Sequence, residues 1–420
     1  MSKVSAAKGK QKKTQKQSAG APVGIDGIQV IPQISSTELK FTIRNERGKE
    51  SQYPPCFANS LRRTIIADLP TYLISRKQIH FTEATSMIHQ DMLTHRLHIS
   101  PICLDKVIRL EQPASLEFVC DVANPDDEMH DVLLRHFIPK YLDEELNPED
   151  FWTNPDILIA KLRSGQAIRC QGSFHLGTSY TEDSGFQCVA ATRYVNGTSE
   201  EVLQRNFEAA KAKGLILPGQ EELWLVNHRE QAVDHNDDGC PMEYQYTMES
   251  LGVYQPLDIV PVAAWILENR FTNISQTLED WLNHYQDMEG RESWKQGNHL
   301  DVTWYEAEGV PALDLRFSHE NETLSDLLTY WIRRDPRVKF VGFRIPHPLD
   351  KLVIIRVSLT NSTRTKEGAH DIIHLVKEHV DKLAKQWADF GAEFSEKASY
   401  ELSDEMKIWL RESLPKILSL

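Results

Sequence analysis

The residues best suited to recognition chemistry lie in the stretch FANSLRRTIIADLP, from Phe57 to Pro70. Its apolar side chains recur four residues apart, which predicts a helix with one buried stripe. Asn59, Arg62 and Arg63 follow the spacing i, i+3 and i+4, so they share another face of that helix. Because a guanidinium group bonds carboxylates and carbonyls in protein interfaces, the arginine pair could anchor a partner. The alternative, that either arginine brackets carbonyl groups inside the fold, stays open.

Other candidate sites for chemistry have weaker patterns. The stretch DHNDDG (234–239) imitates the start of a calcium loop, but position twelve would be Gln245 instead of a bidentate glutamate. His370 and His374, with Glu378 one turn further, lack a third zinc ligand at a defined spacing. The six cysteines form no CxC or CxxC pair, and no phosphate-binding loop or nucleophile elbow is present. The sequence therefore predicts no cofactor, no metal site and no catalytic residue.

Charge is distributed unevenly along the 420-residue chain. It contains 47 Lys and Arg against 61 Asp and Glu, and six of the lysines lie in residues 1–22, which contain no acidic residue. The remaining chain is therefore strongly acidic and ill suited to direct contact with a nucleic-acid backbone. The basic tail is expected to be disordered, and nucleic-acid contact, localisation and plain solubilisation all remain open for it. No apolar run has the length of a membrane span, and we expect an intracellular protein.

Apolar periodicity places the candidate residues on a series of short elements. In the first part it predicts strands at 37–45 and 71–81, helices at 57–68 and 91–100, and a long helix with a packing seam at 256–285. We interpret residues 108–235 as an inserted, mainly-β subdomain, with strands near 114–122 and 167–174. A helix at 198–214 within it has Thr198 and Glu201 at capping-box spacing and Gly214 at its end.

The second part repeats this order on a smaller scale. The pattern predicts strands at 312–317, 338–345 and 351–359 and helices at 323–334, 368–390 and 404–418. Each late helix has an apolar stripe that needs a partner, so two related units in one chain indicate a covalent version of a dimer. The expected boundaries are a disordered basic tail at 1–22, a larger unit at 23–107 and 236–288, an insertion at 108–235, a linker at 289–308, a smaller unit at 309–390 and a C-terminal helical extension at 391–420.

Several segments resemble the α-like subunits of multisubunit DNA-directed RNA polymerases. FANSLRRTIIADLPTYLI (57–74) resembles their α motif, and DMLTHRLHISPI (91–102) and YTMESLGVYQPLDIVPVAAWIL (246–267) resemble segments of the larger α-like protein of archaeal and eukaryotic polymerases. ENETLSDLLTYWIRRDPRVKFVGFRIPHPLDKLVIIRV (320–357) resembles the smaller α-like protein of the same polymerases. The two normally occupy separate chains. This chain would therefore be a large–small fusion of the kind that large cytoplasmic DNA viruses carry.

The resemblance implies an α+β fold with two α-like dimerisation units. Antiparallel sheets and paired helices would form an intramolecular pseudo-dimer, with the mainly-β subdomain inserted. The residues expected in the shared core are Phe57, Leu61, Ile65, Leu267, Phe271, Ile274, Leu324, Leu328, Ile373, Val376, Val380 and Leu383. Asn59, Arg62, Arg63, His95 and Arg96 would dock the second-largest polymerase subunit.

The function implied by the resemblance is a non-catalytic assembly platform that holds the two large catalytic subunits of an RNA polymerase. Small zinc-bearing subunits are further candidate partners, DNA would be met only through the complex, and no membrane contact or homodimer is expected. The location would be a viral factory and the virion, or the nucleus. A free-standing α-fold adaptor or transcription regulator is the alternative.

Three departures from the family pattern stand out. Many larger α-like subunits carry a cysteine cluster in the inserted region, and this sequence has none. His98 stands where glycine is common after the His-Arg-Leu segment, and Ser325 and Asp326 replace a Gly-Asn pair. These changes bear on local backbone geometry and leave the expected fold unchanged.

Overall fold

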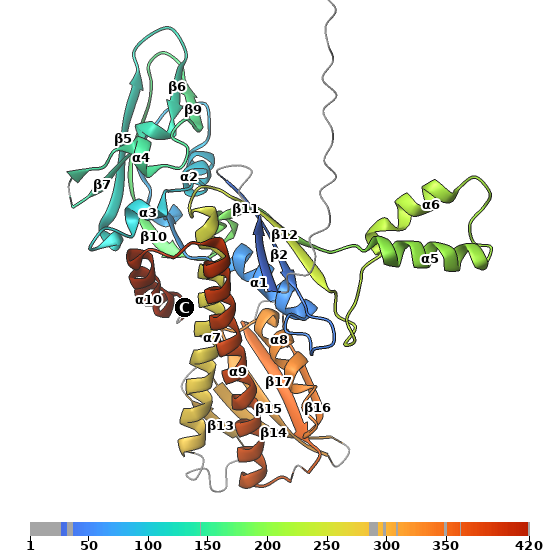
Figure 1. The fold of residues 1–420 in the computed structure, drawn as a ribbon. Helices are drawn as coiled ribbons and strands as arrows, with labels where there is room; N and C mark the ends of the chain where they lie inside the picture. Colours follow the sequence, from blue (N-terminus) through green and yellow to red (C-terminus); the bar gives the residue numbers. More distant parts are fainter. Residues whose placement is uncertain are drawn as a thin grey trace, which may run out of the picture.

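The computed structural model describes residues 27–31, 37–142, 144–284, 293–296, 300–307, 310–347, 351–361 and 363–418. The basic tail at 1–22 and Tyr285, the last apolar residue of the expected long helix, lie outside these ranges. The described strands pair antiparallel, and helices cover them (Figure 1). The expected α+β architecture with antiparallel sheets is confirmed. Within the described residues, no helix has the length and apolar character needed to cross a lipid bilayer.

The larger unit is a four-stranded sheet with two helices. The strand order is β1 (Gly27–Ile31), β2 (Glu38–Arg44), β12 (Glu243–Ser250) and β11 (Val189–Asn196). Helix α1 (Pro55–Ala67) begins with a proline at its first turn, where the missing N–H is tolerated, and helix α7 (Pro256–His284) contains Pro261 close to its start. Leu39, Phe41 and Ile43 alternate into the core from β2, as the period-two pattern requires.

The smaller unit is a five-stranded sheet with two helices. Its strand order is β13 (Ser293–Gln296), β14 (Leu300–Ala307), β15 (Val310–Ser318), β17 (Leu352–Leu359) and β16 (Val338–Arg344), with helices α8 (Glu322–Ile332) and α9 (Lys366–Ala398). The expected linker at 289–308 was wrong for two stretches, because β13 pairs with β14 and β14 pairs with β15 along its whole length. Leu300 and Val302 are buried there, but their polar neighbours made the stretch look like a loop.

The two units share one hydrophobic core. Helices α7 and α9 lie side by side, and α1 packs against both α7 and α8 (Figure 1). The Phe57 ring stacks on Trp387 with centroids 3.9 Å apart, which joins α1 of one unit to α9 of the other. All the side chains expected in the shared core are at most 5% exposed and belong to one cluster. Burial of this apolar surface, at about 25 cal/mol per Å², holds the units together.

The third sheet contains most of the expected insertion, but the boundaries at 108 and 235 do not match it. It has the order β3 (Thr71–Ile74), β10 (Gln166–Gly177), β5 (Leu116–Asn124), β7 (Ile138–Tyr141) and β8 (Glu144–Glu145), and β4 (His80–Ala84) also pairs with β10. Nearby lie the β6 (His130–Leu133) and β9 (Leu158–Leu162) pair and the helices α2 (Gln90–His98), α3 (Leu104–Val107) and α4 (Pro148–Phe151).

The pairing redraws the boundaries of the insertion. The expected strand at 71–81 is two strands, β3 and β4, and both pair with β10 of the insertion. Conversely, β11 at 189–196 pairs with β12 and so belongs to the sheet of the larger unit. The reason is physical: local alternation shows that a segment is a strand, but the strand it pairs with is set by contacts distant in sequence.

Two helical additions complete the fold. Helices α5 (Glu200–Ala212) and α6 (Glu221–His228) form an arm between β11 and β12 (Figure 1). The α5 N-cap is Ser199, whose hydroxyl accepts from the Val202 amide, so the expected capping-box pair is off by one residue. Gly214 follows α5 with φ of 68°, a left-handed conformation that favours glycine. Helix α10 (Asp404–Leu418) follows α9, which runs eight residues beyond the expected end at 390.

Candidate protein interface

Arg63 is bonded inside the fold. Its Nε atom donates to the Thr323 hydroxyl at 2.7 Å, and a terminal nitrogen donates to the Glu322 carboxylate at 2.8 Å. Both acceptors lie in the first turn of α8, and the neighbouring Ser60 hydroxyl bonds the Thr323 carbonyl at 2.9 Å. Arg63 therefore ties the larger unit to the smaller one, and the alternative role left open for it, bracketing groups within the fold, is the one the geometry supports.

Arg62 and Asn59 form a local pair on α1. The Arg62 guanidinium donates to the Asn59 side-chain oxygen at 2.9 Å, and both side chains are half-buried. No carboxylate partner of Arg62 occurs among the described hydrogen bonds and ion pairs. Among the described contacts this guanidinium bonds only its own helix, so of the α1 pair Arg62 is the one not committed to holding the two units together.

Helix α2 presents a mixed apolar and polar face. His95 is exposed, and beside it Met92 and Ile99 are 54% and 47% exposed, at i−3 and i+4 on the same face. Arg96 lies on this face too, but it donates to the Ile159 carbonyl at 2.8 Å and so holds α2 against β9. We define these three exposed residues, Met92, His95 and Ile99, as the α2 face. Sequence reasoning found His95 but missed its apolar neighbours, although their helical spacing was visible.

His98 is buried where α2 meets β3. Its Nδ1 lies 2.7 Å from the Ile74 carbonyl oxygen and its Nε2 lies 3.1 Å from an Asp183 carboxylate oxygen. Burial opposes ionisation of Asp183, but the bonds from His98 and the Gly185 amide outweigh it and lower the pKa of that carboxyl. The histidine that replaces the common glycine thus locks the end of α2 and the orientation of the α2 face.

A buried ion cluster crosses the joint between the two units. Arg270 of α7 is 3% exposed and donates to Asp68, just after α1, at 3.0 Å. It also donates to Glu320, just before α8, and reaches the α8 N-cap residue Asn321 at 3.4 Å. Burial raises the pKa of both Asp68 and Glu320, with Arg270 opposing that shift. One cation thus serves two desolvated carboxylates, which fixes the relative position of α1, α7 and α8.

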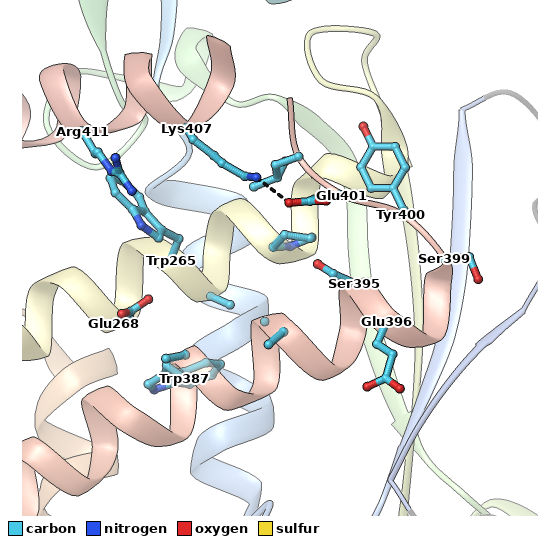
Figure 2. A pocket seen from close by; sticks show the side chains of 16 residues that line it. Trp265, Glu268, Trp387, Ser395, Glu396, Ser399, Tyr400, Glu401, Lys407 and Arg411 are labelled. Atoms are coloured by element: carbon cyan, nitrogen blue, oxygen red, sulfur yellow. Dashed lines mark hydrogen bonds and ion pairs between the residues drawn. The ribbon is translucent and has the colours of Figure 1, made fainter. Parts of the chain in front are cut away.

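The C-terminal extension bounds a groove of about 670 Å³ beside α7 and α9 (Figure 2). Trp265 and Arg411 are among its lining residues, and Lys407, which also lines it, bonds Glu401 at 2.8 Å. Tyr400 next to it donates to Asp258 at 2.6 Å, and burial raises the pKa of its phenol. The groove has no constellation of nucleophile and base, and its salt bridge ties the segment before α10 to α10 itself. Among the described residues, no three His, Cys, Asp or Glu side chains are arranged to hold a metal ion.

Comparison with known proteins identifies the family. The model of the RNA polymerase Rpb3/Rpb11 dimerisation domain matches residues 312–386. DNA-directed RNA polymerase subunit Rpo11 of Sulfurisphaera tokodaii is 30% identical over 78 residues, covering 19% of this chain and 84% of that protein. The chain belongs to the Rpb3/Rpb11 family. DNA-directed RNA polymerase subunit Rpo3 of Methanosarcina acetivorans is 27% identical over 280 residues, 59% of this chain and 97% of that relative.

In this Rpb3/Rpb11-family chain the five expected docking residues fall into two groups. Arg63 and Arg96 bond groups within the fold, on α8 and β9 respectively. Asn59 and Arg62 bond each other, and His95 is exposed. Sequence reasoning missed Asp68, Arg270 and Glu320, which form the joint. The signal that could have found them was an arginine in the middle of an apolar helical seam.

Proposed function

We propose that this chain is a non-catalytic assembly-platform subunit of a DNA-directed RNA polymerase in which the larger and smaller α-like subunits are fused. The observation that carries the proposal is the shared core. Two units, each with its own sheet and helix pair, bury α1, α7, α8 and α9 against one another within one chain. The matches to relatives called Rpo3 and Rpo11 support the same conclusion, since each kind of relative is covered for most of its length.

Fusion has a physical consequence for assembly. Covalent linkage holds the two units at a high effective concentration, so the core forms without a separate association step. We therefore expect the isolated chain to be a monomer with its dimerisation helices already occupied. Multi-angle light scattering tests this directly, and a stable homodimer in solution would contradict the intramolecular arrangement.

The catalytic subunits would dock on the surface that remains free. We propose that the second-largest subunit contacts the Asn59–Arg62 pair and the α2 face. Such a surface combines an arginine with exposed methionine and isoleucine, the composition found at the centre of protein interfaces. Arg63 and Arg96 hold α1 and α2 in place beside this surface, because they bond Thr323 and the Ile159 carbonyl.

The test is co-expression with the cognate second-largest polymerase subunit. A Met92→Ser, His95→Ala and Ile99→Ser triple variant should lose the complex while its unfolding midpoint stays that of the parent chain. Phe340→Ser is the matched control, because Phe340 is similarly exposed at 53% and lies on β16 of the smaller unit. A complex that survives the triple variant with unchanged affinity would refute docking through α2, and no complex with the parent chain would favour a free-standing adaptor.

A further inference from the structure

The α5–α6 arm stands away from both dimerisation sheets (Figure 1). Its ends are adjacent, because Thr198 and Val233 form a β-bridge and the Ser199 amide donates to the Ala232 carbonyl at 2.8 Å. Inside, Leu203 and Ala232 are each 1% exposed and belong to a small cluster that is separate from the main core. The arm is therefore a self-contained helical hairpin on a narrow base, not a loop pressed onto the body.

The outer part of the arm is apolar and uncovered. Leu215 and Leu217, between the two helices, are 69% and 61% exposed. Leu223 and Val226, three residues apart on α6, are 57% and 69% exposed. Helix α6 has no buried residue at all, which is unusual for a helix with four consecutive apolar side chains at 223–226. We call Leu215, Leu217, Leu223 and Val226 the arm patch. Several exposed apolar side chains gathered in one short segment indicate a binding site.

The charges beside the arm patch have both signs. Lys211 and Lys213 precede it, and Glu221 and Glu222 open α6 directly before Leu223. Nucleic acid and anionic lipid surfaces select uniformly basic neighbours, which this patch lacks. An apolar centre with a rim of mixed charge is instead the composition of a protein–protein interface.

The position of the arm indicates which protein it meets. Its base continues from β11, and β11 packs against α1. Because β11 packs against α1, the root of the arm lies near the Asn59–Arg62 pair; in keeping with this, burial raises the pKa of Tyr194 on β11 and the Arg62 charge opposes that rise. The arm thus extends the proposed docking surface outward from the body.

We propose that the arm is a second contact for the polymerase subunit that docks beside α1. Its α6 helix would lie in a groove of that subunit with an apolar floor and a rim of both charge signs, with Leu223 and Val226 as anchors. This inference rests on the proposed function, because the partner is the subunit assigned there. It adds a distinct surface, some distance along the chain from the α2 face.

Hydrogen exchange on the full chain, free and in complex with the second-largest subunit, tests the proposal. Amides of 215–228 should exchange at least about tenfold more slowly in the complex. A Leu223→Ser and Val226→Ser variant should weaken the complex about tenfold or more. Ile408→Ser on α10, where the side chain is 56% exposed, should leave the affinity unchanged. Replacing residues 200–231 by a short Gly-Ser turn should match the double variant, since the Thr198–Val233 bridge keeps the strands together.

The outcomes separate this inference from the proposed function. A complex that forms while the arm exchanges at its free rate overturns the arm contact and leaves the proposed function standing. Absence of any complex overturns both. Dimers of the free chain that disappear in the Leu223→Ser and Val226→Ser variant would show that a second copy occupies the arm patch. Arm protection in the free chain that vanishes on removal of residues 1–22 would assign the patch to the basic tail. Either result overturns the proposal.

Discussion

Replacing Arg270 by methionine should strongly destabilise the joint between the two units. The substitution keeps most of the side-chain volume but leaves Asp68 and Glu320 buried without their shared cation. Removal of one partner from a buried ion pair costs about 3–5 kcal/mol, because the remaining charge is desolvated and uncompensated. Two carboxylates lose their partner here, and Arg270 is only 3% exposed, so we expect the upper part of that range.

The loss should depend on pH in a defined direction. In the parent chain burial already raises the pKa of Asp68 and Glu320, and Arg270 opposes this rise. Without the arginine both folded-state pKa values rise further above their unfolded values of about 3.9 and 4.3. A carboxyl whose folded-state pKa is raised loses stability as pH increases through the interval between the two values. The difference in the free energy of unfolding between variant and parent should therefore be smaller near about pH 5 than near about pH 8.

Urea unfolding at both pH values measures these differences, with Arg169→Met as the matched control. Arg169 also bonds two carboxylates, Glu83 and Asp121, but its side chain is exposed to solvent on the third sheet. Exposed ion pairs contribute about 0–1 kcal/mol, so the control should change little at either pH. A loss below about 1 kcal/mol for Arg270→Met, or a loss that does not vary with pH, would refute the argument that Arg270 neutralises two buried carboxylates.

Three further outcomes follow from the contacts. Arg63→Ala should lower the free energy of unfolding by about 0.5–1.5 kcal/mol through loss of its bond to the buried Thr323 hydroxyl, because the exposed pair with Glu322 adds little; urea unfolding measures this. Asp335→Asn should cost about 1–3 kcal/mol at neutral pH. The Arg337 guanidinium holds the pKa of Asp335 well below its usual range, so this difference should persist at neutral pH and shrink only as pH falls below about 4, as acid titration of the unfolding midpoint would show. Trp409→Ala should cost about 3–5 kcal/mol, and faster proteolysis of 399–418 should report release of α10.

The sequence predicts the helices of this fold well because their signal is local. The apolar spacing in 256–285 and 404–418 matches α7 and α10 to within one residue. The strand β14 was missed because Leu300 and Val302 alternate with charged and polar residues that resemble a linker. It forms a strand because it pairs with β15, and its own residues do not indicate that pairing.

Site residues are harder to predict than elements, because their partners are distant in sequence. Arg63 and Thr323 are 260 residues apart, and nothing near Arg63 indicates that it bonds α8. Arg270, by contrast, had a local signal: it lies directly before Phe271 in a seam of buried apolar residues. A charged residue in such a position is almost never fully buried unless it is paired, so the seam could have indicated an ion cluster.

An aspartate follows the first helix of each unit, α1 in the larger and α8 in the smaller, and the contacts of the two aspartates explain this repeat. Asp68 follows α1 and bonds Arg270 of α7, whereas Asp335 follows α8 and lies 3.1 Å from His379 of α9. In both units the aspartate joins the end of the first helix, α1 or α8, to a basic side chain about halfway along the long second helix, α7 or α9. The two joints differ in their environment, because Asp335 also bonds the exposed Arg337, whereas Asp68 shares its buried arginine with the opposite unit.

Because of this difference, the two joints stabilise different parts of the pseudo-dimer. The Asp68 joint crosses from the larger unit to the smaller one through Glu320, so it stabilises the pairing of the units. The Asp335 joint stays within the smaller unit and stabilises only that unit. Variants of Arg270 should therefore loosen the contact between units, whereas variants of Asp335 should loosen the smaller unit alone. Hydrogen exchange can distinguish the two, since only the first should expose amides of both α1 and α8 together.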